Sequence, residues 1–407
     1  MSDPRSGFFG HPPALATLFF TEMWERFTFY GMRALLVLFL VDAVSNGGYG
    51  LDDKTATAIY GLYTAAVFMA ALPGGWIADR LIGAQRAVLA GGALMTLGNL
   101  MLAIPGPPTL FFAGLTVIIL GVGLLKPNIS TLVAELYPEG GARRDAGFTI
   151  FYMGINLGAF IGPLIAGWLA LRYGWRVGFL AAAVGMPLGL LQFWLSRARL
   201  DGAGAHPNRP DHGAGLKRDW TALGIAVAAL GVLALLLFSG TLAVSPAPLA
   251  KSAAYVLVGM AAAYFLYLFF GAGLAPDERR RIQVVLVMFV ACALFWSGFE
   301  QAGSSMNLFA KRHTDRFVGG CEIPAGWFQS VQPAFVILFA PVFSALWVRL
   351  ARRNLDPAAP FKFAFGLLLM GLGFLFMVKA AGIVAGGLQA PAYFLVLTYL
   401  VHTFGEL

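Results

Sequence analysis

Long apolar stretches recur along the chain, and short polar segments separate them. Each stretch is long enough to cross about 30 Å of hydrocarbon as an α-helix. The strands of a membrane β-barrel would instead alternate in polarity over about 10 residues. The pattern therefore predicts an all-α polytopic membrane protein. The predicted spans are 14–42, 55–78, 86–104, 109–136, 146–171, 175–196, 219–240, 250–274, 282–310, 325–350, 361–381 and 390–407.

Composition agrees with this pattern. Of the 407 residues, 12% are charged and 59% are hydrophobic, whereas a soluble domain carries about 25% charged residues. A soluble enzyme and a disordered chain are therefore excluded. The net charge of +8 does not indicate nucleic acid as a partner, because the basic residues gather in alternate loops without an aromatic-interleaved patch. Their asymmetry predicts a cytoplasmic N-terminus.

The longest polar stretch, 197–218, is rich in Gly, Pro and charge, and we expect it to be a cytoplasmic linker between helical blocks. Six predicted spans precede it and six follow, an arrangement that resembles a transporter of the major facilitator type. Residues 75–86, with Asp79 and Arg80, resemble the signature loop of that superfamily. An ordinary cytoplasmic loop with basic anchors is the alternative for this segment.

The first predicted span carries four ionisable residues, Glu22, Glu25, Arg26 and Arg33. At 100° per residue they share one stripe of a helix, and that stripe is unsuited to face lipid. Glu22 and Arg26 have the spacing of an intrahelical ion pair, while Arg33 needs a partner from another helix. The stripe is either an ion-pair seam that holds helices together or part of a functional site.

Three more ionisable residues lie in later spans: Lys126, which Pro127 follows, Glu300 and Glu406. Together with the first span, the buried set contains four carboxylates and three cations. One negative charge is left over, so one carboxylate has a reason to bind a proton. Such an arrangement is what proton coupling requires.

Seven sequence blocks resemble the proton-dependent oligopeptide transporter family. Residues 22–33 (EMWERFTFYGMR) are similar to its E-x-x-E-R-F-x-Y-Y signature. The remaining blocks extend this resemblance over almost the whole chain. They are 75–86, 126–129, 145–156, 295–304, 327–330 and 405–407.

The resemblance implies how the two ends of a short peptide are held. Arg26 and Lys126 match the residues that bind the peptide carboxylate, and both are cations suited to it. Asn156 and Glu406 match those that bind the α-amino group. Side-chain pockets are expected near aromatic and polar residues of both halves. These further substrate-binding candidates are Tyr30, Arg33, Tyr63, Trp296 and Gln332.

The resemblance also implies a proton-coupling set. Glu22 and Glu25 match the acidic pair of the first helix. Glu300 matches a seventh-helix proton acceptor that pairs with Arg33 when it is deprotonated. Protonation would break this pair and free the two bundles to move.

The chain departs from the family pattern inside the expected pocket. Phe29 and Phe68 stand where many members carry Tyr, and Gln332 stands where Asn is usual. These changes affect the expected selectivity of the pocket and leave the proton-coupling residues unchanged. Two assignments keep a structural alternative: Asn156 could form a helix–helix hydrogen bond, and the aromatic residues Tyr63 and Trp296 could serve packing or the interface.

We therefore expect a proton-coupled symporter of di- and tripeptides in a bacterial inner membrane, multi-pass and monomeric, driven by the proton gradient without a cofactor or metal. The alternative is the same fold with another substrate, such as nitrate, amino acids or other small anions. An intramembrane enzyme is disfavoured because no metal or nucleophile constellation lies in the spans. A channel is disfavoured because the buried charges are of mixed sign.

The family blocks also change the interpretation of the spans. The block with Glu300 opens the second bundle of the family, yet it lies in the ninth predicted span. The expected domains are a six-helix N-terminal bundle (1–196), a linker with an extra helical hairpin (197–279) and a C-terminal bundle (280–407). That last bundle has four of six helices, which predicts a C-terminally truncated chain.

Overall fold

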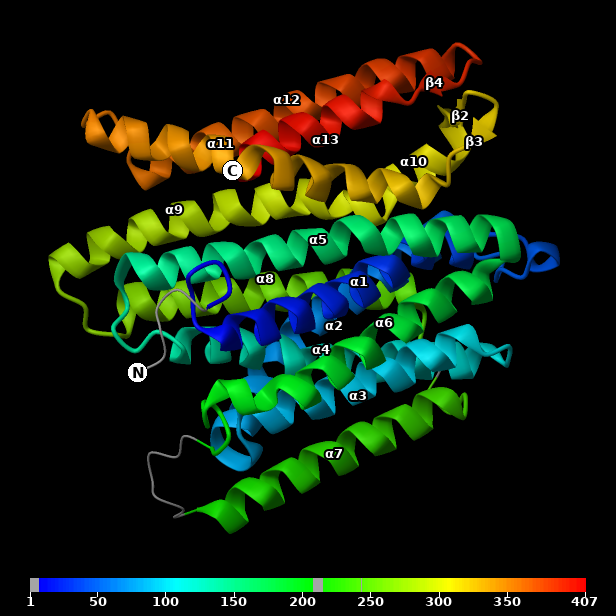
Figure 1. Ribbon diagram of the computed structural model, residues 1–407. Coiled ribbons are helices and arrows are strands. Elements are labelled where there is room, and N and C mark those ends of the chain that lie inside the picture. Colours follow the sequence, from blue (N-terminus) through cyan, green and yellow to red (C-terminus); the bar gives the residue numbers. More distant parts are fainter. Residues whose placement is uncertain (1–6, 208–214, 243) are drawn as a thin grey trace. The chain divides into compact units, whose positions relative to one another are not determined.

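The computed structural model describes residues 7–207, 215–242 and 244–407, and it is built almost entirely of α-helices (Figure 1). Residues 208–214 of the predicted linker lie outside the described residues. The α-helices are α1 (Pro13–Val41), α2 (Asp53–Ile77), α3 (Ala84–Ala103), α4 (Pro108–Glu135), α5 (Gly141–Tyr173), α6 (Trp175–Ser196), α7 (Leu216–Phe238), α8 (Pro246–Phe270), α9 (Pro276–Phe299), α10 (Ser305–His313), α11 (Val331–Arg352), α12 (Ala359–Ala385) and α13 (Tyr393–Glu406).

Short elements join these helices. The strands are two residues long: β1 (Thr314–Asp315) pairs in parallel with β4 (Ala390–Pro391), and β2 (Phe317–Val318) pairs antiparallel with β3 (Cys321–Glu322). A π-helical turn, η2 (Ala78–Ile82), continues the end of α2. The other turns are 3₁₀-helical: η1 (Val44–Asn46), η3 (Arg197–Leu200), η4 (Glu300–Gly303) and η5 (Ala325–Ser330).

Among the described residues, 10 helical segments are long and apolar enough to cross a membrane. The charged α1 and the 14-residue α13 are not among them. The prediction of an all-α polytopic membrane protein is confirmed at this level. The finer division into six, two and four helices stays a prediction.

The structure divides into two compact units. The first contains residues 1–35, 43–48 and 61–246, and the second contains 36–42, 49–60 and 247–407. The C-terminal end of α1 and the N-terminal end of α2 thus belong with the second unit, and α7 belongs with the first.

In the first unit, α5 approaches α1 through glycines. A Cβ on Gly158 would stand 2.1 Å from the carbonyl oxygen of Met23, and one on Gly162 would stand 2.4 Å from that of Phe27. Only a residue without a side chain allows the two backbones to come this close, which is the usual role of small residues between membrane helices. The contact holds the charged helix α1 against α5.

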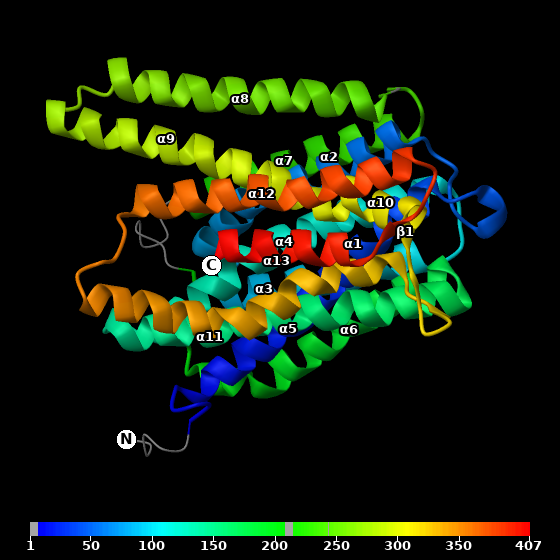
Figure 2. The same ribbon diagram turned by 90° about the horizontal axis from the view of Figure 1, so that it is seen from above.

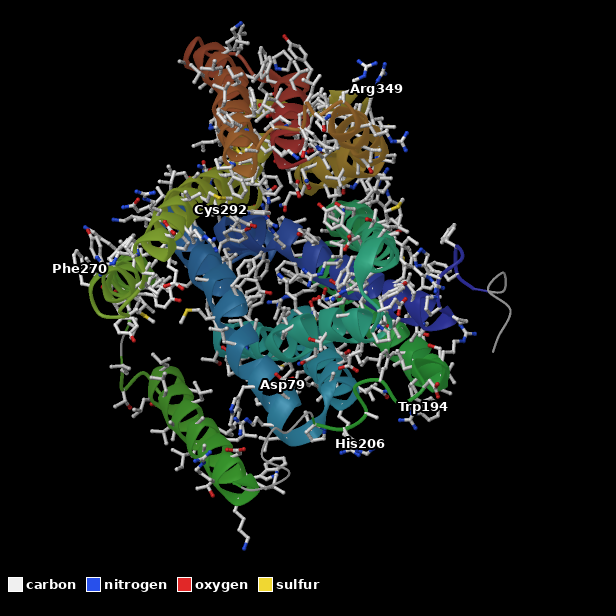
Figure 3. All side chains as sticks on the ribbon, turned by 90° about the vertical axis from the view of Figure 1, so that its left-hand side faces the viewer. Asp79, Trp194, His206, Phe270, Cys292 and Arg349 are labelled. Atoms are coloured by element: carbon white, nitrogen blue, oxygen red, sulfur yellow. The ribbon has the colours of Figure 1, made fainter. Side chains whose placement is uncertain are left out.

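In the second unit, α12 packs against α9 and α13, and α11 packs against α13. Helices α8 and α9 lie side by side (Figure 2), where Phe265 contacts Phe289 at a ring-centroid distance of 5.4 Å. At the end of α8, Phe270 points outward (Figure 3) and is 82% exposed. Outward apolar side chains are expected where a helix faces hydrocarbon.

The glycine contact generates a stability prediction. Gly162→Ala should lower the free energy of unfolding by about 1–3 kcal/mol, because the added methyl group forces α1 and α5 apart. The measurement is thermal unfolding of the purified protein in detergent. Gly61→Ala on α2 is the matched control, because no atom lies within 4 Å of its added Cβ. Equal unfolding temperatures for the two variants would contradict the prediction.

Candidate functional site

The candidate residues fall into two sets, one in each unit. Within the first unit, the Arg26 Nε atom lies 3.0 Å from Glu22 Oε1 and also contacts the Glu25 carboxylate. All three side chains are buried, with exposed fractions of 4% or less. The predicted ion pair between Glu22 and Arg26 is confirmed, and Glu25 joins it.

Burial of these charges is tolerable only because they compensate one another, since an isolated charge at bilayer depth costs at least about 2.5–3.5 kcal/mol. The two carboxylates outnumber the single guanidinium, and Lys126 of α4 interacts electrostatically with Glu25. Arg26 Nη2 is buried and has no hydrogen-bond partner among the described residues. This donor is suited to an incoming acceptor such as a carboxylate.

Aromatic rings accompany the cations of the first unit. Lys126 Nζ lies 4.4 Å from the ring centroid of Phe68, and the Arg26 guanidinium lies 5.4 Å from that of Phe29. Both distances are in the range of cation–π interaction, which needs a ring face and no hydroxyl. Phe29 and Phe68 therefore make this contact without a hydroxyl group. Phe29 also stacks on the buried Tyr63, with a centroid distance of 6.3 Å.

Two other candidates of the first unit have local contacts. The Arg33 guanidinium lies 5.3 Å from the ring centroid of Tyr30, one turn earlier on α1. Asn156 Nδ2 donates to the Tyr152 carbonyl oxygen at 3.0 Å, within α5. A bond inside one helix does not join two helices, so it leaves both predictions for Asn156 open.

In the second unit, Glu300 lies where the ninth predicted span is interrupted. Helix α9 ends at Phe299, the turn η4 follows, and Ser304 has non-helical dihedral angles before α10 begins. Such interruptions leave backbone groups available for binding in transporters. The Tyr60 hydroxyl donates to Glu300 Oε2 at 3.2 Å.

Sequence reasoning missed Tyr60. The residue is 4% exposed, and it precedes Tyr63 by three positions, so the two share one face of α2. This three-residue spacing on one helix was the sequence signal that could have identified Tyr60 as a neighbour of the candidate Tyr63. The predicted pair of Arg33 and Glu300 would join the two units and stays a prediction.

The other candidates of the second unit lie on α9, α11 and α13. Gln332 Nε2 donates to Glu406 Oε2 at 2.5 Å. The Gln332 amide thus reaches the Glu406 carboxylate directly. Trp296 is 43% exposed and packs edge-on against Phe299, with 5.0 Å between ring centroids. The described residues contain no group of three or more His, Cys, Asp or Glu side chains that could hold a metal ion.

The comparisons with known proteins agree with the motif pattern. The model of the POT family matches residues 85–212 and 222–407. The chain belongs to the POT family. Peptide transporter YePEPT of Yersinia enterocolitica is 42% identical over 98% of this chain and 80% of the relative. A di-/tripeptide transporter of Lactococcus lactis is 37% identical over 98% of this chain and 82% of the relative.

A solved structure, the peptide transporter POT in complex with sulfate, has a TM-score of 0.90 and 40% identity, covering 100% of this chain and 82% of that one. These proteins are transporters and not enzymes. Membership of the family therefore makes this chain a multi-pass membrane protein of a transporter family, as expected from its spans.

The cluster of charges on α1 generates a second stability prediction. Arg26→Met should destabilise the protein by about 3–5 kcal/mol, because it leaves two buried carboxylates without their nearest cation. Adding Glu22→Gln and Glu25→Gln to this variant should restore most of the loss, since the two buried carboxylates that lost the Arg26 guanidinium are then replaced by neutral amides. Thermal unfolding in detergent measures both. If the triple variant were no more stable than Arg26→Met alone, the ion pairs would not be what stabilises this part of α1.

Proposed function

We propose that this POT family member is a proton-coupled symporter that imports di- and tripeptides by alternating access. The observation that carries the proposal is the opposite charge of the two candidate sets. In the first unit, cations outnumber carboxylates; in the second unit, the candidate ionisable residues are carboxylates. These residues are Glu22, Glu25, Arg26, Arg33 and Lys126 in the first unit, and Glu300 and Glu406 in the second.

A zwitterionic peptide, with a carboxylate at one end and an ammonium group at the other, suits one set of residues rich in cations and a second set of carboxylates. Its carboxylate is bound by Arg26, whose Nη2 donor is available, and by Lys126, whose position Phe68 supports. Its ammonium group is bound by Glu406, which Gln332 orients, together with Asn156. A simple anion would use the cations alone and would leave Glu406 without a role. The relatives of Yersinia enterocolitica and Lactococcus lactis are peptide transporters, which supports the same substrate class.

Proton coupling is assigned to Glu22, Glu25 and Glu300, with Arg33 as the partner of the last. When Glu300 is charged, it pairs with Arg33 and accepts the hydrogen bond of Tyr60. When it is protonated, the ion pair loses its attraction and the helices that carry the two residues are free to separate. Each transport cycle then carries protons with the peptide.

The proposed location is the inner membrane of a bacterium, with the N-terminus in the cytoplasm. The support is the excess of Lys and Arg in the loops on the N-terminal side. The monomer is the proposed working unit, and the proton gradient supplies the energy without a cofactor.

The first test is uptake of a labelled dipeptide into proteoliposomes made with the purified protein. An inward-directed proton gradient should drive accumulation, and collapse of the gradient with a protonophore should abolish it. A panel of dipeptides with different side chains is used, so that narrow substrate selectivity of the transporter does not hide transport. If no peptide is accumulated but nitrate or a single amino acid is, the fold carries another substrate and the peptide proposal fails.

Glu300→Gln provides the matched variant for the same assay. The amide is similar in shape and accepts the Tyr60 hydrogen bond, but it does not exchange protons. Gradient-driven accumulation should be lost, whereas exchange of peptide across the membrane without a gradient should remain. If Glu300→Gln still accumulated peptide in response to the proton gradient, Glu300 would not be a proton-coupling residue.

A third experiment tests how the two ends of the peptide are bound. Lys126→Gln should raise the KM for dialanine by about 10–100-fold, the effect of losing one charged hydrogen bond, and should abolish discrimination against the C-terminally amidated peptide. Glu406→Gln should instead abolish discrimination against the N-acetylated peptide. Lys379→Gln, at an exposed position of α12, is the control. If each variant lost discrimination against both the amidated and the N-acetylated peptide to the same extent, the assignment of Lys126 to the peptide carboxylate and of Glu406 to the ammonium group would be contradicted.

A further inference from the structure

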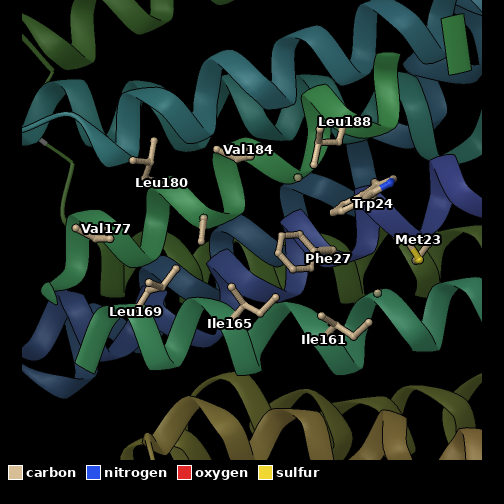
Figure 4. A pocket seen from close by; sticks show the side chains of 13 residues that line it. Met23, Trp24, Phe27, Ile161, Ile165, Leu169, Val177, Leu180, Val184 and Leu188 are labelled. Carbon is tan, nitrogen blue, oxygen red and sulfur yellow. The ribbon is translucent and has the colours of Figure 1, made fainter. Parts of the chain in front are cut away.

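An apolar hollow of about 430 Å³ lies in the first unit, away from the charged stripe of α1. Its walls come from α1, α5 and α6, and Figure 4 shows Trp24 and Phe27 of α1 between the facing side chains of the other two helices. Ile165 of α5 and Val184 and Leu188 of α6 are among the residues that line it. Almost every atom that lines the hollow is apolar, so it suits a hydrocarbon chain.

A second hollow of about 430 Å³ continues from the first along α6, and Leu188 lines both. This one is polar at its far end, where Gln192, Ser196 and Arg199 contribute to its wall. The Thr21 hydroxyl donates to Gln192 Oε1 at 3.1 Å, and Gln192 Nε2 donates to Ser196 Oγ at 3.1 Å. The first hollow is apolar, the second has a basic residue at its far end, and Leu188 lines both; the two are called the groove from here on.

The groove opens away from the interior of the unit. On α6, the exposed apolar residues recur every three or four positions, which places them on one face of the helix; they are Leu180, Val184, Leu188, Leu191 and Leu195. Trp194 also points outward (Figure 3). In a membrane protein such a face contacts lipid. The natural occupant is therefore a lipid.

The basic end determines which lipid. Arg199 makes no ion pair with any residue that the structure describes, and Arg197, two positions earlier, lies over the Trp194 ring at 5.9 Å. The Arg199 guanidinium thus lines the hollow at the end of α6. An acyl chain gains little by leaving other chains for an apolar groove, because both surroundings are hydrocarbon. Selectivity must then come from the headgroup, and Arg favours a phosphate.

We propose that this groove is a binding site for one anionic glycerophospholipid, from the leaflet at the N-terminal end of α1. The phosphate lies at Arg199, with Ser196 beside it, and one acyl chain runs past Leu188 to Trp24 and Phe27. These two residues flank Glu25 and Arg26 in the sequence of α1. The bound chain therefore supports the face of α1 opposite the ion-pair cluster and fills a space that would otherwise lack packing contacts.

The test is native mass spectrometry of the purified, delipidated protein after addition of phosphatidylglycerol or phosphatidylcholine with identical acyl chains. The wild type should retain one phosphatidylglycerol and bind it about tenfold more tightly than phosphatidylcholine, as expected for one charge-assisted hydrogen bond. Arg199→Gln should remove this preference. Arg352→Gln, at the exposed end of α11, is the matched control and should keep it.

A second pair of variants tests the acyl groove. Val184→Trp should fill it and lower binding of phosphatidylglycerol about tenfold, whereas Val232→Trp on the exposed face of α7 should not. If Val184→Trp does not fold, a fluorescence measurement replaces it. One equivalent of acyl-brominated phosphatidylglycerol should quench part of the tryptophan fluorescence of the protein. Trp24→Phe should remove this quenched part of the fluorescence, whereas Trp220→Phe should retain it. Equal binding of the two lipids, or equal binding by Arg199→Gln and Arg352→Gln, would overturn the proposal.

Discussion

Charge that is buried at membrane depth is the constraint on which the structure of the first unit depends. Glu22 and Glu25 share the guanidinium of Arg26, and none of the three reaches solvent. Because an isolated charge is costly in hydrocarbon, the helix that carries them must be enclosed by others. The glycines of α5 allow this enclosure, since they let its backbone approach α1 to van der Waals distance.

The same constraint explains which side chains surround the buried cations. Phe68 and Phe29 carry no hydroxyl, yet each presents a ring face to a cation. A ring face stabilises a buried cation without a hydrogen bond. In the second unit, the Gln332 amide donates to Glu406. Within each unit, the charged groups are thus contacted by neutral side chains suited to their sign.

One contact of the candidate site could be predicted because its residues obey a local rule. The four-residue spacing of Glu22 and Arg26 implied an ion pair in any helix, and the structure contains it. Contacts between distant segments could not be derived in this way. Tyr60 and Glu300 are 240 positions apart, and no periodicity relates them. The break of the ninth predicted span at η4 was also missed, because hydropathy measures the length of an apolar run and not its backbone conformation.

The sequence by itself determined the class of this protein: long apolar runs require helices in a membrane, and the ordered motifs identify the POT family. It also determined which side chains carry charge into the hydrocarbon. Only the tertiary structure decided which neighbours those charges have, that Lys126 lies over Phe68, that Glu300 accepts from Tyr60, and that a groove with a basic end runs along α6. The physical reason is that hydrophobicity and helical spacing are properties of neighbouring residues, whereas contacts between helices depend on how separate surfaces fit together.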